Sequence, residues 1–182
     1  MKKKSARCSN AELLEVNYMK KLFLLLPALL LLVACSAAKP NFVFMEKTAV
    51  DQNTGLTWAK NANMPGRQLI WRGDDNVYEY IKRLNETSYA GYADWRVPSK
   101  EEMARLVEYA KAMGYDQAKM DTWPYQKLRQ LGFIDVRDYD YWTSTRQSPT
   151  EIWTVDMANG KLAPKQESKP YFLWPVRGNS SR

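Results

Sequence analysis

Apolar side chains recur three and four positions apart in two parts of the chain, which is typical of amphipathic helices that bury one face. The first stripe predicts a helix over residues 75–87. Its members are Val77, Tyr80, Ile81 and Leu84. The second stripe predicts a helix over 100–113, where Ser99 and Glu102 form a capping box for the first turn. A third, short helix is expected over 124–132.

Short runs of β-branched and aromatic residues predict strands on both sides of these helices. We expect strands at 42–44, around Val50, and at 56–58, 141–145, 151–157, 161–164 and 171–177. Asn159–Gly160 suits a two-residue type I′ turn, while Pro170 and Pro175 favour an edge or irregular position for the last strand. Because the strands do not alternate with the helices, the sequence predicts an α+β fold. It has two main helices and small antiparallel sheets in a single domain over 42–178, with a tail at 179–182.

The N-terminal segment has the layout of a signal peptide. Met19-Lys20-Lys21 begins it, an apolar run fills 22–33, and Ala34 and Cys35 end it. A helix of that length rises only about 18 Å, too little for a hydrocarbon core of roughly 30 Å. Leu32–Cys35 resembles the lipobox of bacterial lipoproteins, which implies that Cys35 is lipidated, carries palmitate and becomes the first residue of the mature chain. A generic secretory signal is the alternative.

Residues 1–34 are therefore expected to be removed, leaving a lipidated tether over 35–41. Residues 1–18 do not fit the layout, so either translation begins at Met19 or the signal peptide has an unusually long charged region. Loss of residues 1–34 removes six basic and two acidic residues, which lowers the formal net charge from +7 to +3. An excess this small argues against nucleic acid as a partner.

The sequence contains no histidine and two cysteines, Cys8 and Cys35. Without imidazole there is no Ser-His-Asp triad, no Cys-His pair and no His-ligated zinc. Cys8 leaves with the signal peptide and Cys35 carries lipid, so the mature domain has no disulfide. These absences favour a binding or structural module over an enzyme.

Four stretches resemble, in order, the bacterial domain family named after the C-terminal domain of the Legionella collagen-like adhesin. They are 51–58, 91–99 with Glu102, 141–145 and 176–178. The motif residues are Gly55, Trp58, Asp94, Trp95, Arg96, Pro98, Trp142 and Arg177. The central segment is also similar to the helix start of formylglycine-generating-type domains, which implies a C-type-lectin-like fold.

The resemblance implies more about fold than about activity. We expect the motif residues to be mainly structural, with Trp58, Trp95 and Trp142 in the core and ligand contact as the alternative. The cysteine pair of formylglycine-generating enzymes and the calcium-binding triplets of sugar-binding lectins do not occur in this sequence. The adhesin branch of the family implies binding of sulfated glycans.

One loop combines carboxylates with aromatic rings. Asp135, Asp138 and Asp140 could hold Ca²⁺, and Tyr139 and Tyr141 could stack on sugar rings. The alternative is a solvated loop, because Arg137 lies inside the cluster. We expect Tyr139, Tyr141 and Trp153 to be the exposed aromatic residues, and no cofactor other than this Ca²⁺.

These observations predict an envelope lipoprotein with a non-catalytic binding domain, whose ligand is a glycan or another envelope protein. Ser36, instead of an aspartate, follows Cys35, which favours the outer membrane. A structural scaffold in an envelope complex is the alternative. A carboxylate hydrolase is a weaker one, because Glu101 and Glu102 suit a helix N-terminus better than a catalytic pair.

Overall fold

The computed structural model describes residues 38–116, 118–119 and 123–179. They belong to one compact unit, Ala37–Arg182. The predicted signal peptide and Cys35 lie outside the described residues. Within the described part of the chain, no helix is both long enough and apolar enough to cross a membrane.

The first sheet joins the two ends of the domain. It contains β1 (Phe42–Phe44), β2 (Thr48–Asp51), β3 (Thr57–Ala59) and β7 (Val176–Arg177) in the order β1-β2-β3-β7, with antiparallel neighbours. The last strand is much shorter than the predicted 171–177. It lies at the edge of its sheet directly after Pro175, as the prolines indicated.

The second sheet is an antiparallel meander of β4 (Asp140–Ser148), β5 (Glu151–Asp156) and β6 (Leu162–Gln166). The predicted hairpin of 151–157 with 161–164 is confirmed. Its two-residue turn at Asn159–Gly160 is wrong, because Asp156 N–H bonds the carbonyl of Lys161 (2.9 Å) and four residues, 157–160, connect the strands. Met157 is fully buried and its N–H bonds the carbonyl of Tyr139 (3.1 Å). Its burial draws the residue after β5 into the core and lengthens the turn.

Three α-helices form within the described residues: α2 (Val77–Glu86), α3 (Lys100–Ala112) and α4 (Pro124–Leu131). The side chain of Asn76 caps α2 by accepting from the N–H of Glu79 (3.0 Å). The predicted capping box of α3 is confirmed, since Ser99 Oγ accepts from Glu102 N–H (3.2 Å) and Glu102 Oε2 accepts from Ser99 N–H (2.7 Å). The predicted helices agree with these bounds to within two residues.

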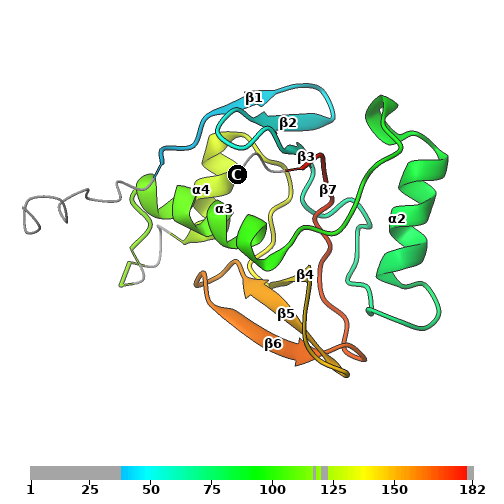
Figure 1. The fold of residues 1–182 in the computed structure, drawn as a ribbon. Coiled ribbons are helices and arrows are strands. Elements are labelled where there is room, and N and C mark those ends of the chain that lie inside the picture. Colours follow the sequence, from blue (N-terminus) through cyan, green and yellow to red (C-terminus); the bar gives the residue numbers. More distant parts are fainter. Residues whose placement is uncertain (1–37, 117, 120–122, 180–182) are drawn as a thin grey trace, which may run out of the picture. The chain divides into compact units, whose positions relative to one another are not determined.

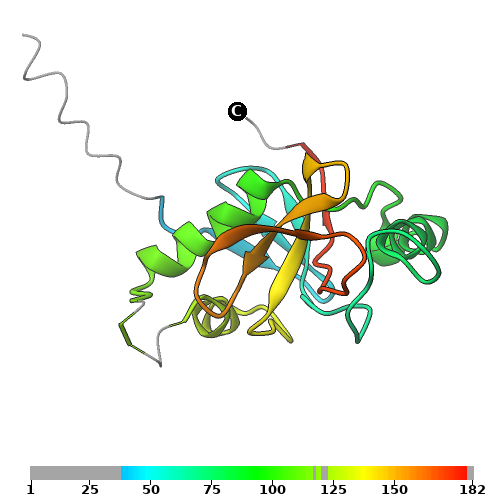
Figure 2. The same ribbon diagram turned by 90° about the horizontal axis from the view of Figure 1, so that it is seen from below.

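The helices separate into two groups around the sheets. Figure 1 shows α3 between the β1–β2 strands and the β4–β5–β6 sheet, with α4 beside it. Both views show α2 on the opposite side of the domain from α4 (Figure 1 and Figure 2). The predicted α+β class with small antiparallel sheets is confirmed.

Aromatic rings fill the core. The predicted burial of Trp58, Trp95 and Trp142 is confirmed, because none of the three is more than 2% exposed. Trp58 packs edge-on against Trp174 with ring centroids 5.7 Å apart. A second, smaller cluster lies around Trp71 and Trp142, whose ring centroids are 5.3 Å apart. This second cluster borders the candidate site described below.

Candidate functional site

Two of the three aspartates in the predicted carboxylate loop form ion pairs with basic residues of the same domain. Asp135 pairs with Arg137 (Oδ1 to Nε, 2.7 Å) and accepts a hydrogen bond from Asn63 (2.9 Å). Asp140 accepts from the hydroxyl of Thr154 (2.9 Å) and pairs with Lys165 at 3.4 Å. Asp138 is exposed. Among the described residues, no group of three His, Cys, Asp or Glu side chains could hold a metal ion.

The three aromatic residues predicted to be exposed differ in their environments. Tyr139 is 56% exposed, as expected. The expectation for Tyr141 is wrong: the ring is fully buried, its hydroxyl accepts from the N–H of Arg137 (2.7 Å), and burial raises the pKa of that hydroxyl. Trp153 is half-buried, with the ammonium of Lys100 4.5 Å from its ring centroid. The predicted residues therefore do not form one ligand surface.

Arg96, at the centre of the family-like motif, is fully engaged in holding the fold. Its guanidinium bonds both carboxylate oxygens of Glu102 (2.8 and 2.7 Å), the carbonyl of Gly178 twice (3.2 and 2.7 Å) and the carbonyl of Val97 (3.4 Å). An arginine carries five N–H groups, and these contacts use each of them. Arg96 thus ties the start of α3 to the end of β7 and has no donor left for a ligand.

Glu102 is the other half of this link. Burial by itself would raise the pKa of its carboxyl, but the hydrogen bonds from Arg96 and from the N–H of Ser99 outweigh burial, and the pKa is lowered. The carboxylate therefore stays ionised at neutral pH and completes the capping box and the ion pair together.

The remaining motif residues also have structural contacts. Asp94 pairs with Arg177 in a two-pronged contact (2.7 and 3.1 Å), and the hydrogen bond from Arg177 lowers the pKa of the carboxyl. Gly55 has φ +75° in the turn between β2 and β3, a conformation that glycine adopts without strain. The carbonyl of Pro98 accepts from the N–H of Ser144 (2.7 Å), which joins the start of α3 to β4.

An open pocket of about 340 Å³ lies beside this link, where α2, the motif segment and β4 meet. We call it the aromatic pocket. It is lined by Trp71, Tyr78, Ile81, Arg96, Val97 and Ser144.

Two aromatic rings give the aromatic pocket its character. Trp71 and Tyr78 meet edge to face with ring centroids 5.3 Å apart, and Tyr78 is 51% exposed. The indole N–H of Trp71 has no hydrogen-bond partner in the described part of the chain. Ser144 is exposed and lies at the rim of the aromatic pocket. The volume is at the small end of the about 300–1,000 Å³ typical of ligand pockets, so the geometry suits a small ring or a side chain.

Sequence reasoning missed Trp71, Tyr78 and Ser144 as site residues. Trp71 lies in a turn-rich segment without periodicity, and Tyr78 is on the helix face next to the predicted apolar stripe. A large aromatic residue adjoining an amphipathic stripe was the available signal for Tyr78. Ser144 joins them only through folding, since it is more than sixty positions away in the sequence.

The fold and the site together define a small α+β domain with a structural arginine–glutamate link. The family model of the Lcl C-terminal domain matches residues 47–177. The chain belongs to this family, which confirms the resemblance noted in the sequence. No curated protein matches the chain.

Proposed function

We propose that the chain is a lipid-anchored envelope protein whose Lcl C-terminal domain, with a C-type-lectin-like fold, binds a glycan without catalysing a reaction. The observation that carries the proposal is the aromatic pocket. The lipobox-like Leu32–Cys35 supports the anchor, and Ser36 supports the outer membrane as its location.

The lining of the aromatic pocket favours a neutral glycan. The exposed ring of Tyr78 offers an apolar face on which the C–H face of a sugar ring can stack, and Ser144 offers a hydroxyl at the rim. Arg96 is the charged residue of the lining, and each of its N–H groups is already bonded within the protein. A sulfate group would therefore find no free guanidinium in this pocket.

The carboxylate loop supports a non-catalytic role. Glycoside hydrolysis needs two carboxyl groups about 5–10 Å apart in a cleft. Asp135 and Asp140 each face a cation of the same chain, and neither belongs to the lining of the aromatic pocket. We propose accordingly that the domain recognises its ligand and leaves it unchanged.

The test uses the purified fragment 36–182, which contains the compact unit, on an array of neutral and sulfated glycans with and without Ca²⁺. We expect binding to a neutral glycan that does not depend on Ca²⁺. Tyr78→Ala should weaken this binding about two- to tenfold, and Tyr78→Phe should retain it. Tyr139→Ala, which alters another exposed tyrosine outside the pocket, is the matched control. Absence of any glycan bound by the folded fragment would refute the glycan proposal.

A second candidate is a scaffold that binds another envelope protein. Ile81 and Val97 in the aromatic pocket favour it, because they could also receive an apolar side chain of a partner. Pull-down of the full chain from membranes separates the two: a stoichiometric protein partner lost in Tyr78→Ala supports the scaffold.

The anchor has its own test. Labelled palmitate should be incorporated into the full chain, and Cys35→Ser should abolish both labelling and membrane association. Unchanged labelling of Cys35→Ser would show that the lipobox interpretation is wrong.

A further inference from the structure

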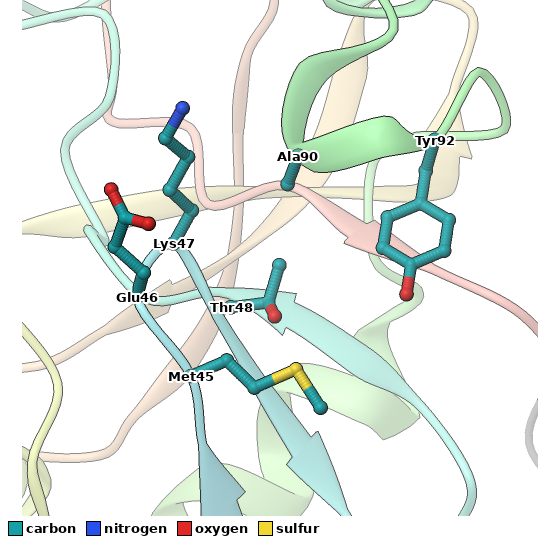
Figure 3. Close-up of a pocket in the computed structure, with 6 residues that line it drawn as sticks. All are labelled: Met45, Glu46, Lys47, Thr48, Ala90 and Tyr92. Atoms are coloured by element: carbon teal, nitrogen blue, oxygen red, sulfur yellow. The ribbon is translucent and has the colours of Figure 1, made fainter.

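A second pocket of about 270 Å³ lies between the turn that joins β1 to β2 and the short 3₁₀ helix Tyr89–Gly91. We call it the hairpin pocket. It is lined by Met45, Glu46, Lys47, Thr48, Ala90 and Tyr92. None of these residues lines the aromatic pocket. Figure 3 shows Thr48 between Glu46 and Lys47 on one side and Tyr92 on the other.

Thr48 gives the hairpin pocket a polar group that the protein does not use. The residue is only 3% exposed, and its hydroxyl has no hydrogen-bond partner among the described residues. The oxygen is not one of the fully buried polar atoms that lack a partner, so it stays accessible from the pocket. A ligand group in the hairpin pocket can therefore form a hydrogen bond with it.

Glu46 and Lys47 place opposite charges next to each other at the same pocket. Both are exposed, and neither takes part in an ion pair within the described residues. The charge of Glu46 also acts on Tyr89, the residue before Ala90: burial raises the pKa of the Tyr89 hydroxyl, and the negative charge of Glu46 raises it further. One carboxylate and one ammonium are thus available to a ligand.

The walls supply apolar surface on a strained backbone. Met45 is 52% exposed, and the ring of Tyr92 is covered on one side by the guanidinium of Arg177, 3.8 Å from its centroid. Ser88 and Ala90 adopt left-handed conformations with φ +47° and +55°. Non-glycine residues in such conformations are strained and cluster at functional sites.

We propose that the hairpin pocket binds a small zwitterionic ligand of the size of an amino acid or dipeptide. Glu46 receives its amine, Lys47 receives its carboxylate, and Thr48 bonds its amide or amine. Met45 and Tyr92 pack against its apolar side chain. This site is separate from the glycan site proposed above and does not depend on it.

The experiment is an NMR titration of the ¹⁵N-labelled fragment 36–182 with glycyl-leucine as the probe. We expect the amide signals of Thr48, Ala90 and Tyr92 to shift. The same dipeptide with an acetylated N-terminus and an amidated C-terminus should leave them in place. Glu46→Gln and Lys47→Gln should each weaken binding about two- to fivefold, as expected for loss of one exposed ion pair.

The matched control is Glu108→Gln, which removes an exposed carboxylate of α3 that pairs with Lys111, and it should bind glycyl-leucine as the parent does. Thr48→Val should also weaken binding, and the two exposed charge variants keep the proposal testable if Thr48→Val does not fold. Absence of shifts at the pocket amides, or equal binding of the blocked dipeptide, overturns the proposal. Tyr78→Ala should not change the titration, so failure of the glycan proposal is distinguishable from failure of this one.

Discussion

Glu102→Gln removes the charge from the arginine–glutamate link while keeping the shape of the side chain. In the parent, Glu102 accepts two charge-assisted hydrogen bonds from Arg96 and one from the N–H of Ser99. Glutamine offers one acceptor oxygen, and its NH₂ group would face an N–H of Arg96. At least one of the two bonds to the guanidinium is therefore lost, and the other becomes a bond to a neutral group.

The structure sets the size of the expected loss. A hydrogen bond to a charged group contributes about 1.5–3 kcal/mol, but the side chain of Arg96 is one-third exposed, so water compensates part of it. We expect the free energy of unfolding to fall by about 2 kcal/mol at neutral pH. For a domain of this size, this corresponds to a thermal midpoint lower by about 4–8 °C.

The effect should depend on pH with a definite sign. The folded protein lowers the pKa of Glu102 from its ordinary value of 4.5. The contribution of the ionised carboxylate to stability is therefore complete above that value and is lost as the pH falls through the lower, folded pKa. Because glutamine does not titrate, the difference between parent and Glu102→Gln should be largest near neutral pH and should shrink below about pH 4.

Urea unfolding of the fragment 36–182 measures this difference. Unfolding is followed by tryptophan fluorescence, once at neutral pH and once below about pH 4. Glu101→Gln is the matched control, because Glu101 is the neighbouring residue, is exposed and, among the described residues, forms just one long ion pair, 3.9 Å from Lys100. It should change stability by less than about 0.5 kcal/mol. A loss in Glu102→Gln no larger than in Glu101→Gln, or one that is the same at both pH values, would refute the reasoning.

Three further changes test other parts of the structure. Gly160→Ala should lower the thermal midpoint more than Gly114→Ala: both glycines have positive φ, but a Cβ at Gly160 would lie 2.6 Å from Val107 whereas one at Gly114 meets nothing within 4 Å. The added overlap costs about 1–3 kcal/mol, and equal midpoints would contradict it. Arg177→Lys should lower the free energy of unfolding in urea by about 1 kcal/mol, because lysine cannot reproduce the two bonds to Asp94 or the stacking on Tyr92, while the half-exposed Asp94 limits the loss; an unchanged free energy would contradict a structural role for this pair. Adding Ca²⁺ or a chelator should leave the midpoint of the fragment unchanged, and a rise with Ca²⁺ would contradict the account of the carboxylate loop.

Local chemistry explains which elements could be predicted. The start of α3 was found from sequence because Ser99 and Glu102 are three residues apart and satisfy each other's backbone without any distant contact. The length of the turn after β5 could not be predicted from the sequence, because it depends on the burial of Met157 in a core formed by residues distant in sequence. The dipeptide Asn159–Gly160 favours a two-residue turn locally, but tertiary packing of Met157 produces the longer turn.

The same distinction applies to the sites. Tyr139 and Tyr141 are two positions apart, so strand alternation would give them the same exposure, but β4 begins only at Asp140 and the hydroxyl of Tyr141 is held by the N–H of Arg137. The aromatic pocket joins Trp71 with residues of α2 and β4. No periodicity connects those segments, and their proximity exists only in the folded domain.

The contacts of Arg96 bear on what family membership can imply. The motif that identifies the family uses its arginine entirely within the protein, tying the start of α3 to the end of β7. A group with every donor engaged cannot also select a ligand by hydrogen bonds. Under the proposed function, hydrogen bonds that select a ligand would come from residues other than Arg96, and Tyr78 would supply the stacking face. Glu102→Gln should then lower the free energy of unfolding while the folded protein still binds the ligand. Tyr78→Ala should weaken ligand binding and leave the free energy of unfolding largely unchanged.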